Sequence, residues 1–158
     1  MFKKILVPLD GSEYSMRALT IAGHIAKKFK ARVTLIHIYS VVPIVQLPIM
    51  HEPTTQAASI IGPVVSPATL TEMAEAPKKI GERILLEATE ELKSRKIVVE
   101  TFLIEGNVVQ EITRVAKEGN FDLVVMGIRG LSKIQELIMG SVSDGVIKQV
   151  QCPVLIVK

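Results

Sequence analysis

Five short, continuously apolar runs alternate with longer amphipathic segments in this chain, and this alternation limits its fold more than any other feature. The runs cover residues 4–9, 32–39, 97–104, 121–126 and 153–157. Continuous apolarity is typical of strands that are buried on both faces, as in parallel sheets. Because strands and helices alternate, we expect an α/β fold with a five-stranded open parallel sheet, helices on both faces and right-handed crossovers.

The segments between the runs have helical spacing. The first helix is expected to begin after Ser12, which has the side chain of an N-cap. Its buried face should be formed by Ala18, Leu19, Ala22, Ile25, Ala26 and Phe29. Helical spacing resumes near residue 70, where Pro77 predicts a break or bend, and continues in Ile80, Ile84, Leu85, Ala88 and Leu92. A third helix is predicted between an Asn107 cap and Gly119, with the apolar positions Val108, Ile112, Val115 and Ala116.

Residues 41–67 interrupt this regularity. They contain five prolines and no sustained period, which predicts a long irregular excursion of the kind that is often functional. Apolar side chains such as Ile44, Leu47 and Ile60 indicate that the excursion packs against a partner subunit or the mouth of a pocket.

The composition is that of a globular protein. With 158 residues, 48% of them apolar and 22% charged, we expect residues 1–158 to form one domain. The formal net charge is +3, and the basic residues occur in short pairs typical of solvated helix and strand ends, such as Lys3-Lys4, Lys27-Lys28 and Lys78-Lys79. Without a basic stripe or stacking aromatic residues, no nucleic-acid partner is expected.

The chain carries no sign of a secreted or membrane protein. It lacks the n-region and h-region of a signal peptide at its start, and no apolar run approaches the ~20 residues that span a bilayer. We therefore expect a cytoplasmic protein without a membrane partner. The lone cysteine, Cys152, has no partner for an internal disulfide and is expected to be a buried structural thiol.

A glycine-punctuated segment follows the fourth run. It reads Gly-Ile-Arg-Gly from residue 127 and, after nine further residues, Gly-Ser-Val-Ser from residue 140. Gly140 and Ser141 open a helix whose free N–H groups attract anions. With the hydroxyl of Ser143 and the charge of Arg129, the segment predicts a phosphate site at the carboxyl edge of the sheet. The alternative is structural: turn glycines, a capping box of Ser141 with Asp144, and a solvated Arg129.

Better-known phosphate loops do not fit this sequence. There is no Gly-x-x-x-x-Gly-Lys-[Ser/Thr] motif, and no Gly-x-Gly-x-x-Gly follows the first run. The residues that do follow it, Asp-Gly-Ser-Glu-Tyr-Ser from residue 10, also lack the Ser/Thr-rich phosphate loop of flavodoxins.

These features together resemble the universal stress protein family, and in particular its ATP-binding branch. The Gly-x2-Gly-x9-Gly-Ser-x-Ser spacing from residue 127 is similar to the ATP-binding signature of that branch, and a branch without these glycines does not bind ATP. The opening Lys-Lys-Ile-Leu-Val-Pro-Leu-Asp-Gly-Ser and the closing Cys-Pro-Val-Leu-Ile-Val resemble the family's first and last strands, and His37-Ile38 resembles the end of its second. The similarity covers essentially the whole chain.

The resemblance implies a Rossmann-like fold related to the adenine-nucleotide α-hydrolases, with strand order 3-2-1-4-5 and ATP, ADP or AMP between strands one and four. Asp10, with Pro8 and Leu9 before it, would lie by the ribose and adenine, and Ile38 would offer backbone groups to the adenine edge. The ribose side would be lined by Met126 and Gly127, and the phosphates would be surrounded by Arg129, Gly130, Gly140, Ser141, Val142 and Ser143.

Metal and partner expectations follow from the same resemblance. Mg²⁺ or Mn²⁺ would be held mainly by the phosphates, because the sequence has no carboxylate cluster for it beyond Asp10. Residues 154–157 would form an exposed apolar edge strand, and the resemblance implies a homodimer through that strand. No catalytic trio or metal-ligand spacing is found. His24 and His37 are expected to be structural, and His51 lies in the excursion without a predicted partner.

Three functions remain open at this point. The first is a nucleotide-dependent regulatory module of the stress response, in which a partner protein reads the ATP-bound state. The second is an enzyme, either a slow ATPase or a nucleotidyl or phosphoryl transferase, which would need a general base and in-line water. The third is an interaction or chaperone-like protein whose glycine segment binds no nucleotide. We favour the first and expect no catalytic residues, with weak ATP hydrolysis as the most that the chain would catalyse.

Overall fold

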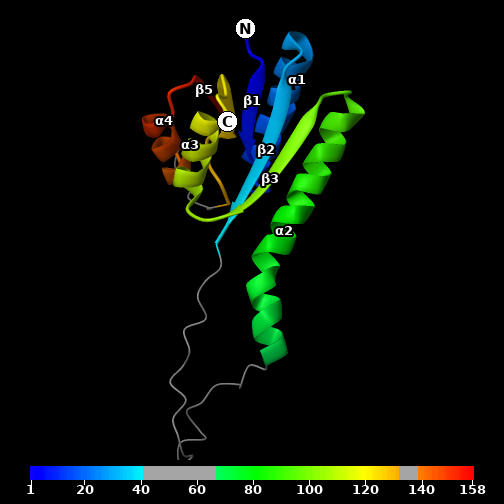
Figure 1. The fold of residues 1–158 in the computed structure, drawn as a ribbon, viewed down its shortest axis with the longest axis vertical. Coiled ribbons are helices and arrows are strands. Elements are labelled where there is room, and N and C mark those ends of the chain that lie inside the picture. Colours follow the sequence, from blue (N-terminus) through cyan, green and yellow to red (C-terminus); the bar gives the residue numbers. More distant parts are fainter. Residues whose placement is uncertain (41–66, 132–138) are drawn as a thin grey trace, which may run out of the picture.

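The structure is a computed structural model that describes residues 1–40, 67–131 and 139–158. Its strands are β1 (Lys4–Pro8), β2 (Arg32–Tyr39), β3 (Val99–Glu105), β4 (Leu123–Gly127) and β5 (Val154–Val157). Its helices are α1 (Glu13–Phe29), α2 (Pro67–Ser94), α3 (Val108–Glu118) and α4 (Ser141–Gln149). Each strand is followed by a helix until β5, as the alternation in the sequence predicts (Figure 1).

The five strands form one parallel sheet in the order β3-β2-β1-β4-β5. The predicted fold class and strand order are therefore confirmed. β1 pairs with β2 from Lys4 opposite Arg32 to Pro8 opposite Ile36, and on its other side with β4. From β1 the chain adds β2 and β3 on one side of the sheet, and β4 and β5 lie on the other side. The loops after β1 and β4 therefore diverge and leave room for a ligand at the carboxyl edge.

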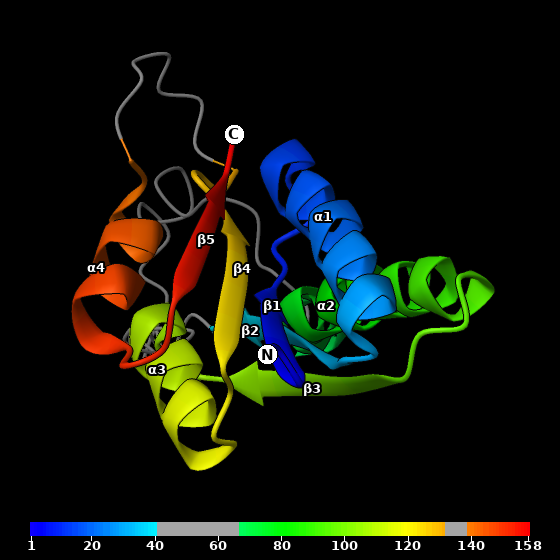
Figure 2. The ribbon, with the colours of Figure 1, turned by 90° about the horizontal axis from the view of Figure 1, so that it is seen from above.

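Helices cover both faces of the sheet. α1 and α2 lie on one face and α3 and α4 on the other (Figure 2). Alternate strand residues point to the two layers, so Ile5, Val7 and Leu35 join the core under α1 and α2, whereas Leu6 and Ile36 join the core under α3 and α4. The sheet is thus buried from both sides, which explains the continuous apolarity of its strands.

Most of the predicted helix signals are present. The Ser12 hydroxyl accepts the N–H of Ser15 at 3.2 Å and caps α1, and the Asn107 side chain accepts the N–H of Gln110 at 3.1 Å and caps α3. Of the break or bend predicted at Pro77, the break is absent, because α2 runs unbroken through this residue. The buried face of α2 also differs from the prediction: Leu85, Ala88 and Leu92 are buried, but Ile80 is 50% exposed. The residue that faces the sheet at this level is Gly81, which lies against His37 of β2 and Leu103 of β3.

Two smaller expectations need correction. His24 is exposed, since it lies just outside the buried face of α1 that Ala22 and Ala26 define. Cys152 is half-buried rather than buried, because it lies in the loop before the edge strand. The excursion, including His51, falls at residues 41–66 outside the described residues, and α2 starts at Pro67. None of the described helices is long and apolar enough to cross a membrane.

Candidate functional site

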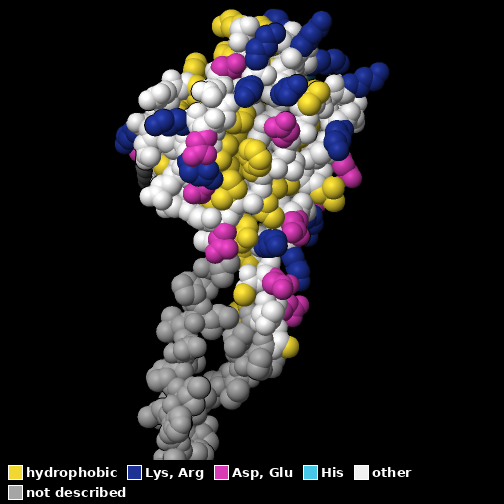
Figure 3. Space-filling model, viewed as in Figure 1, with side chains coloured by type: hydrophobic (Ala, Val, Ile, Leu, Met, Phe, Trp, Pro, Cys, Tyr) yellow, Lys and Arg dark blue, Asp and Glu magenta, His cyan; other side chains and the backbone are white. Residues whose placement is uncertain are grey.

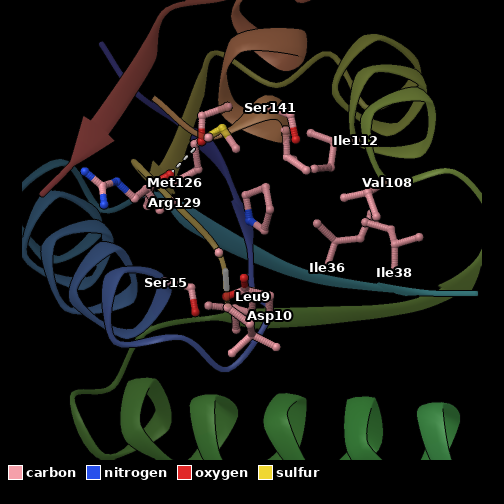
Figure 4. Close-up of a pocket in the computed structure, with 17 residues that line it drawn as sticks. Leu9, Asp10, Ser15, Ile36, Ile38, Val108, Ile112, Met126, Arg129 and Ser141 are labelled. Atoms are coloured by element: carbon pink, nitrogen blue, oxygen red, sulfur yellow. Dashed lines mark hydrogen bonds between the residues drawn. The ribbon is translucent and has the colours of Figure 1, made fainter. Parts of the chain in front are cut away.

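A cavity of about 320 Å³ opens at the carboxyl edge of the sheet, where β1 and β4 end. Its lining comes from the ends of β1 and β2, the start of α3, the segment after β4 and the first turn of α4 (Figure 4). This is the switch point of the sheet, where ligands bind in open α/β folds. The segments that the topology brings together here are separated by up to 135 residues in the chain, from Pro8 to Ser143.

The end of β1 and the segment after β4 meet at Asp10. One carboxylate oxygen of Asp10, Oδ1, accepts the N–H of Ser12 at 3.0 Å, which fixes the side chain in the turn before α1. The other oxygen, Oδ2, lies against Gly130, where an added Cβ would come within 2.5 Å of it. Only glycine allows this approach, so Asp10 and Gly130 form one wall of the cavity together.

A second close approach brings α1 against the end of β4. A Cβ at Gly127 would lie 2.8 Å from the carbonyl carbon of Tyr14 and 3.0 Å from the backbone nitrogen of Ser15. These distances are too short for any side chain. Ser15, in the first turn of α1, can therefore line the cavity opposite α4.

The first turn of α4 supplies backbone donors. Gly140 is its N-cap, has extended dihedral angles and provides no side-chain cap. The first N–H bonded within the helix is that of Asp144, which donates to the Gly140 carbonyl at 3.0 Å. The N–H groups of Ser141, Val142 and Ser143 precede this bond, and all three residues line the cavity. A helix N-terminus of this kind carries partial positive charge and attracts anions.

The capping box of the structural alternative is absent from this segment. A capping box would need Ser141 as the N-cap, but Gly140 occupies that place and Ser141 is the first residue of α4. The Asp144 carboxylate bonds Lys148 Nζ at 2.6 Å, one turn further along the helix. Ser141 is exposed at the cavity, and its hydroxyl is left available to a ligand.

Ser143 differs from its predicted role. Its side chain is 2% exposed, and its hydroxyl bonds the carbonyl oxygens of Gly127 at 2.9 Å and Ile128 at 3.2 Å. A hydroxyl has one proton to donate, and here backbone acceptors take it. The hydroxyl of Ser143 therefore fastens α4 to the end of β4, and only its backbone N–H can serve a phosphate.

Apolar side chains form the opposite end of the cavity. Ile36 and Ile38 of β2 lie close to Val108 of α3, on the side of the cavity away from Arg129 (Figure 4). Ile112 of α3 lies between this group and Ser141 (Figure 4). The helical spacing of Val108 predicts a buried core residue. Its side chain is instead 37% exposed, because α3 begins at the rim of the cavity. The cavity therefore has an apolar half beside β2 and a polar half beside α4.

The structure brings every predicted binding residue to this cavity. The predicted residues in its lining are Pro8, Leu9, Asp10, Ile38, Met126, Gly127, Arg129, Gly130, Gly140, Ser141, Val142 and Ser143. The lining also includes residues that were not predicted: Ser15, Ile36, Val108, Ile112 and Leu131. Ile36 could have been found, because it lies two residues before Ile38 and so shares its face of the strand.

His37 supports the cavity from outside. It is 8% exposed, and its Nδ1 donates to the carbonyl oxygen of Leu9 at 2.8 Å, which joins the end of β2 to the end of β1. Gly81 of α2 leaves room for its ring. The expected structural role of His37 is thus confirmed. Within residues 1–40, 67–131 and 139–158, no group of three or more His, Cys, Asp or Glu could hold a metal ion.

A parallel sheet in this order with a cavity between its first and fourth strands defines a doubly wound α/β protein of the Rossmann-like class. Comparison with known families narrows the class. The model of the universal stress protein family matches residues 1–158, and the chain belongs to this family.

Individual relatives agree with this assignment. Universal stress protein YxiE of Bacillus subtilis is 35% identical over 159 residues, with 100% of both chains covered. Universal stress protein MJ0531 of Methanocaldococcus jannaschii is 32% identical over 158 residues, which cover 100% of this chain and 83% of that one. Among solved structures, a universal stress protein in complex with cAMP has a TM-score of 0.67 at 26% identity and covers 99% of this chain and 97% of its own.

Proposed function

We propose that this chain binds ATP, or ADP or AMP, in the cavity between β1 and β4 and acts as a nucleotide-dependent regulatory module of the stress response. One observation carries the proposal: a single cavity combines an apolar half with the N-terminus of α4. A nucleotide has the same division into an apolar base and an anionic phosphate chain. The relative with bound cAMP adds support, since it shows that a chain of this family can hold an adenine nucleotide.

The proposed orientation follows from the two halves of the cavity. The adenine would lie between the isoleucines of β2 and α3, with the backbone of Ile38 at its edge. The ribose would lie by Asp10 and Met126. The phosphates would meet the N–H groups of residues 141–143 and the hydroxyl of Ser141. A divalent cation would be held by phosphate oxygens, because Asp10 is the one carboxylate among the described residues that line the cavity.

Regulation rather than turnover fits this lining best. A hydrolase or transferase needs a general base placed next to its water or second substrate. Of the described part of the lining, the one carboxylate is that of Asp10, which already accepts the Ser12 N–H and lies against Gly130. We therefore propose that the chain has two arrangements and that bound ATP stabilises the one that a partner protein recognises. The shift between the two arrangements cannot exceed the difference in their affinities for ATP.

Thermal unfolding with ATP, ADP, AMP and cAMP, each with Mg²⁺, tests the binding. Ligand at about 100 times its Kd should add roughly 2.7 kcal/mol to the free energy of unfolding. Gly140→Asp should abolish the gain, because its carboxylate would compete with phosphate for the N–H groups of α4. Asp is a favourable N-cap, so the helix should still form. Gly140→Asn is the matched control without the charge, and it should retain more of the gain. No stabilisation of the unaltered chain by any of the four nucleotides would refute the proposal.

We also propose that residues 1–158 act as one domain and pair as a homodimer through β5. β5 lies at the edge of the sheet with Val154, Leu155 and Ile156 only half-buried. An apolar edge of this kind is usually covered. Light scattering should give twice the mass of the chain, and Leu155→Lys, which adds a charge to the edge, should give the monomer mass. A monomer mass for the unaltered chain would refute the dimer.

A further inference from the structure

The amino edge of the sheet, opposite the nucleotide cavity, gathers basic side chains that are dispersed in the sequence. Residues 27–32 and 91–96 contain seven of the nineteen Lys and Arg of the chain but only one of its sixteen Asp and Glu. They therefore carry a formal charge of +6, whereas the rest of the chain carries −3. Lys and Arg crowd the corresponding end of the molecule in Figure 3. These basic residues, which the sequence spreads over several segments, therefore gather at this end of the fold.

A hollow of about 570 Å³ lies within this basic cluster. Among the described residues that line it, half are basic and none is acidic. The basic residues are Lys27, Lys30, Arg32, Arg95 and Lys96, and the others are Ala26, Ala31, Ser94, Ile97 and Val98. Of the five basic residues, Arg95 is paired, with Glu91 at 2.7 Å. The ends of α1 and α2 and the turns after them form its walls.

The two turns have the same construction. Ala31 donates its N–H to the Ala26 carbonyl at 3.0 Å, and Ile97 donates to the Leu92 carbonyl at 3.2 Å, so each helix ends in a six-residue loop that satisfies its last carbonyls. In each loop the residue before the donor is left-handed, with φ of 54° at Lys30 and 59° at Lys96. Glycine is favoured in this conformation, and any other residue is strained there. Both turns instead hold a lysine, and both lysines line the same hollow.

Helix stabilisation does not account for this much charge. Basic residues near a helix C-terminus offset its negative end, which is worth about half an elementary charge for each helix. Two helices and Glu91 therefore compensate about two of the seven positive charges. The remaining charges repel one another unless an anion lies between them.

We propose that this hollow binds an anion that carries two or more phosphate groups, at a site separate from the nucleotide cavity. The concave shape and volume fit a small ligand rather than a membrane surface. The lining, as far as the structure describes it, offers no aromatic side chain on which nucleic-acid bases could stack. Lysine and arginine at the two turns would contact phosphates from both sides.

The probe for this site is sodium tripolyphosphate, added to the ¹⁵N-labelled chain at constant ionic strength. We expect amide shifts at residues 30–32 and 94–98, and saturation that weakens as NaCl is raised. Residues 127–131 and 139–143 report the nucleotide cavity in the same spectra. Gly140→Asp should remove shifts there and leave those of the basic hollow unchanged, which separates this proposal from the proposed nucleotide function.

Variants test the cause of any binding. Lys27→Gln with Lys30→Gln and Lys96→Gln should raise the Kd about tenfold or more. The control, Lys78→Gln with Lys117→Gln, removes exposed positive charge elsewhere and should change the Kd by less than about twofold. Lys30→Gly should weaken binding while raising the unfolding midpoint, because glycine relieves the left-handed strain. Equal losses in test and control variants would overturn the proposal. So would the absence of shifts around the hollow, or saturable binding only of duplex DNA, anionic vesicles or a polyglutamate peptide.

Discussion

Two serines in the first turn of α4 should respond in opposite ways to replacement by alanine. Ser143 is 2% exposed and bonds the carbonyl of Gly127 at 2.9 Å, so its hydroxyl holds α4 to β4. Ser141 is exposed and lines the cavity. Ser143→Ala should therefore lower the stability of the chain without nucleotide, whereas Ser141→Ala should lower its affinity for nucleotide.

The magnitudes follow from the partners that each change leaves behind. After Ser143→Ala the carbonyl of Ile128 still accepts the N–H of Gly140 at 2.9 Å, but the carbonyl of Gly127 loses its hydroxyl donor. One lost buried hydrogen bond predicts a decrease of about 1–2 kcal/mol in the free energy of unfolding. For a chain of this size the melting temperature would fall by about 3–6 °C. Ser141→Ala should stay within about 0.5 kcal/mol and raise the Kd for ATP about three- to tenfold.

Urea unfolding without nucleotide and calorimetric titration with MgATP measure the two effects separately. Each serine variant serves as the control for the other, since the chemical change is identical and the positions are two residues apart. An unchanged urea midpoint for Ser143→Ala would refute the role of its hydroxyl in fastening α4. A destabilised Ser141→Ala with normal ATP affinity would refute the assignment of the exposed serine to the ligand.

Three further outcomes are expected. Gly127→Ala should destabilise the chain by about 1–3 kcal/mol in thermal unfolding, because its Cβ would lie 2.8 Å from the carbonyl carbon of Tyr14; a neutral result would contradict the close approach. Gly130→Ala should raise the Kd for ATP, since its Cβ would displace the Asp10 carboxylate, and should change the free energy of unfolding little, since Gly130 and Asp10 are exposed enough to relax. Burial raises the pKa of the Cys152 thiol, so alkylation by iodoacetamide should reach half its maximal rate at a higher pH in the folded than in the urea-unfolded chain; coincident profiles would contradict this.

The sequence contained most of the information about the fold, because its strands are buried on both faces and its turns carry strong caps. Ser12 and Asn107 cap the helices that they were expected to cap. The failures lie where tertiary position overrides local pattern. Pro77 stays within α2, in a part of the helix with mostly exposed neighbours. Ile80 is predicted on the buried face, but its neighbour Gly81 is the residue that lies against the sheet, and Ile80 is 50% exposed.

The candidate site was predictable to the level of residues but not of atoms. Glycines and the start of a helix at the carboxyl edge predict a cavity from the backbone alone, independently of how the side chains are oriented. The direction of a hydroxyl is different, because it depends on which acceptors the fold brings near. Nothing in the sequence distinguishes Ser143, bonded to backbone 16 residues away, from Ser141 at the cavity. Val108 likewise reads as core, although the start of α3 at the rim places it in the cavity lining.

The two ends of this sheet differ in how they can attract an anion. In a parallel α/β fold every helix runs antiparallel to its strands, so helix N-termini lie at the carboxyl edge and C-termini at the amino edge. The carboxyl edge therefore attracts anions through its helix N-termini, and among the described residues the lining of its cavity has one arginine and no lysine. At the amino edge the helix ends are negative and an anion would be repelled. If an anion binds at the amino edge as proposed, side-chain charge has to reverse that field. Five basic residues line the hollow there, and two of them, Lys30 and Lys96, stand at left-handed positions that glycine would occupy with less strain.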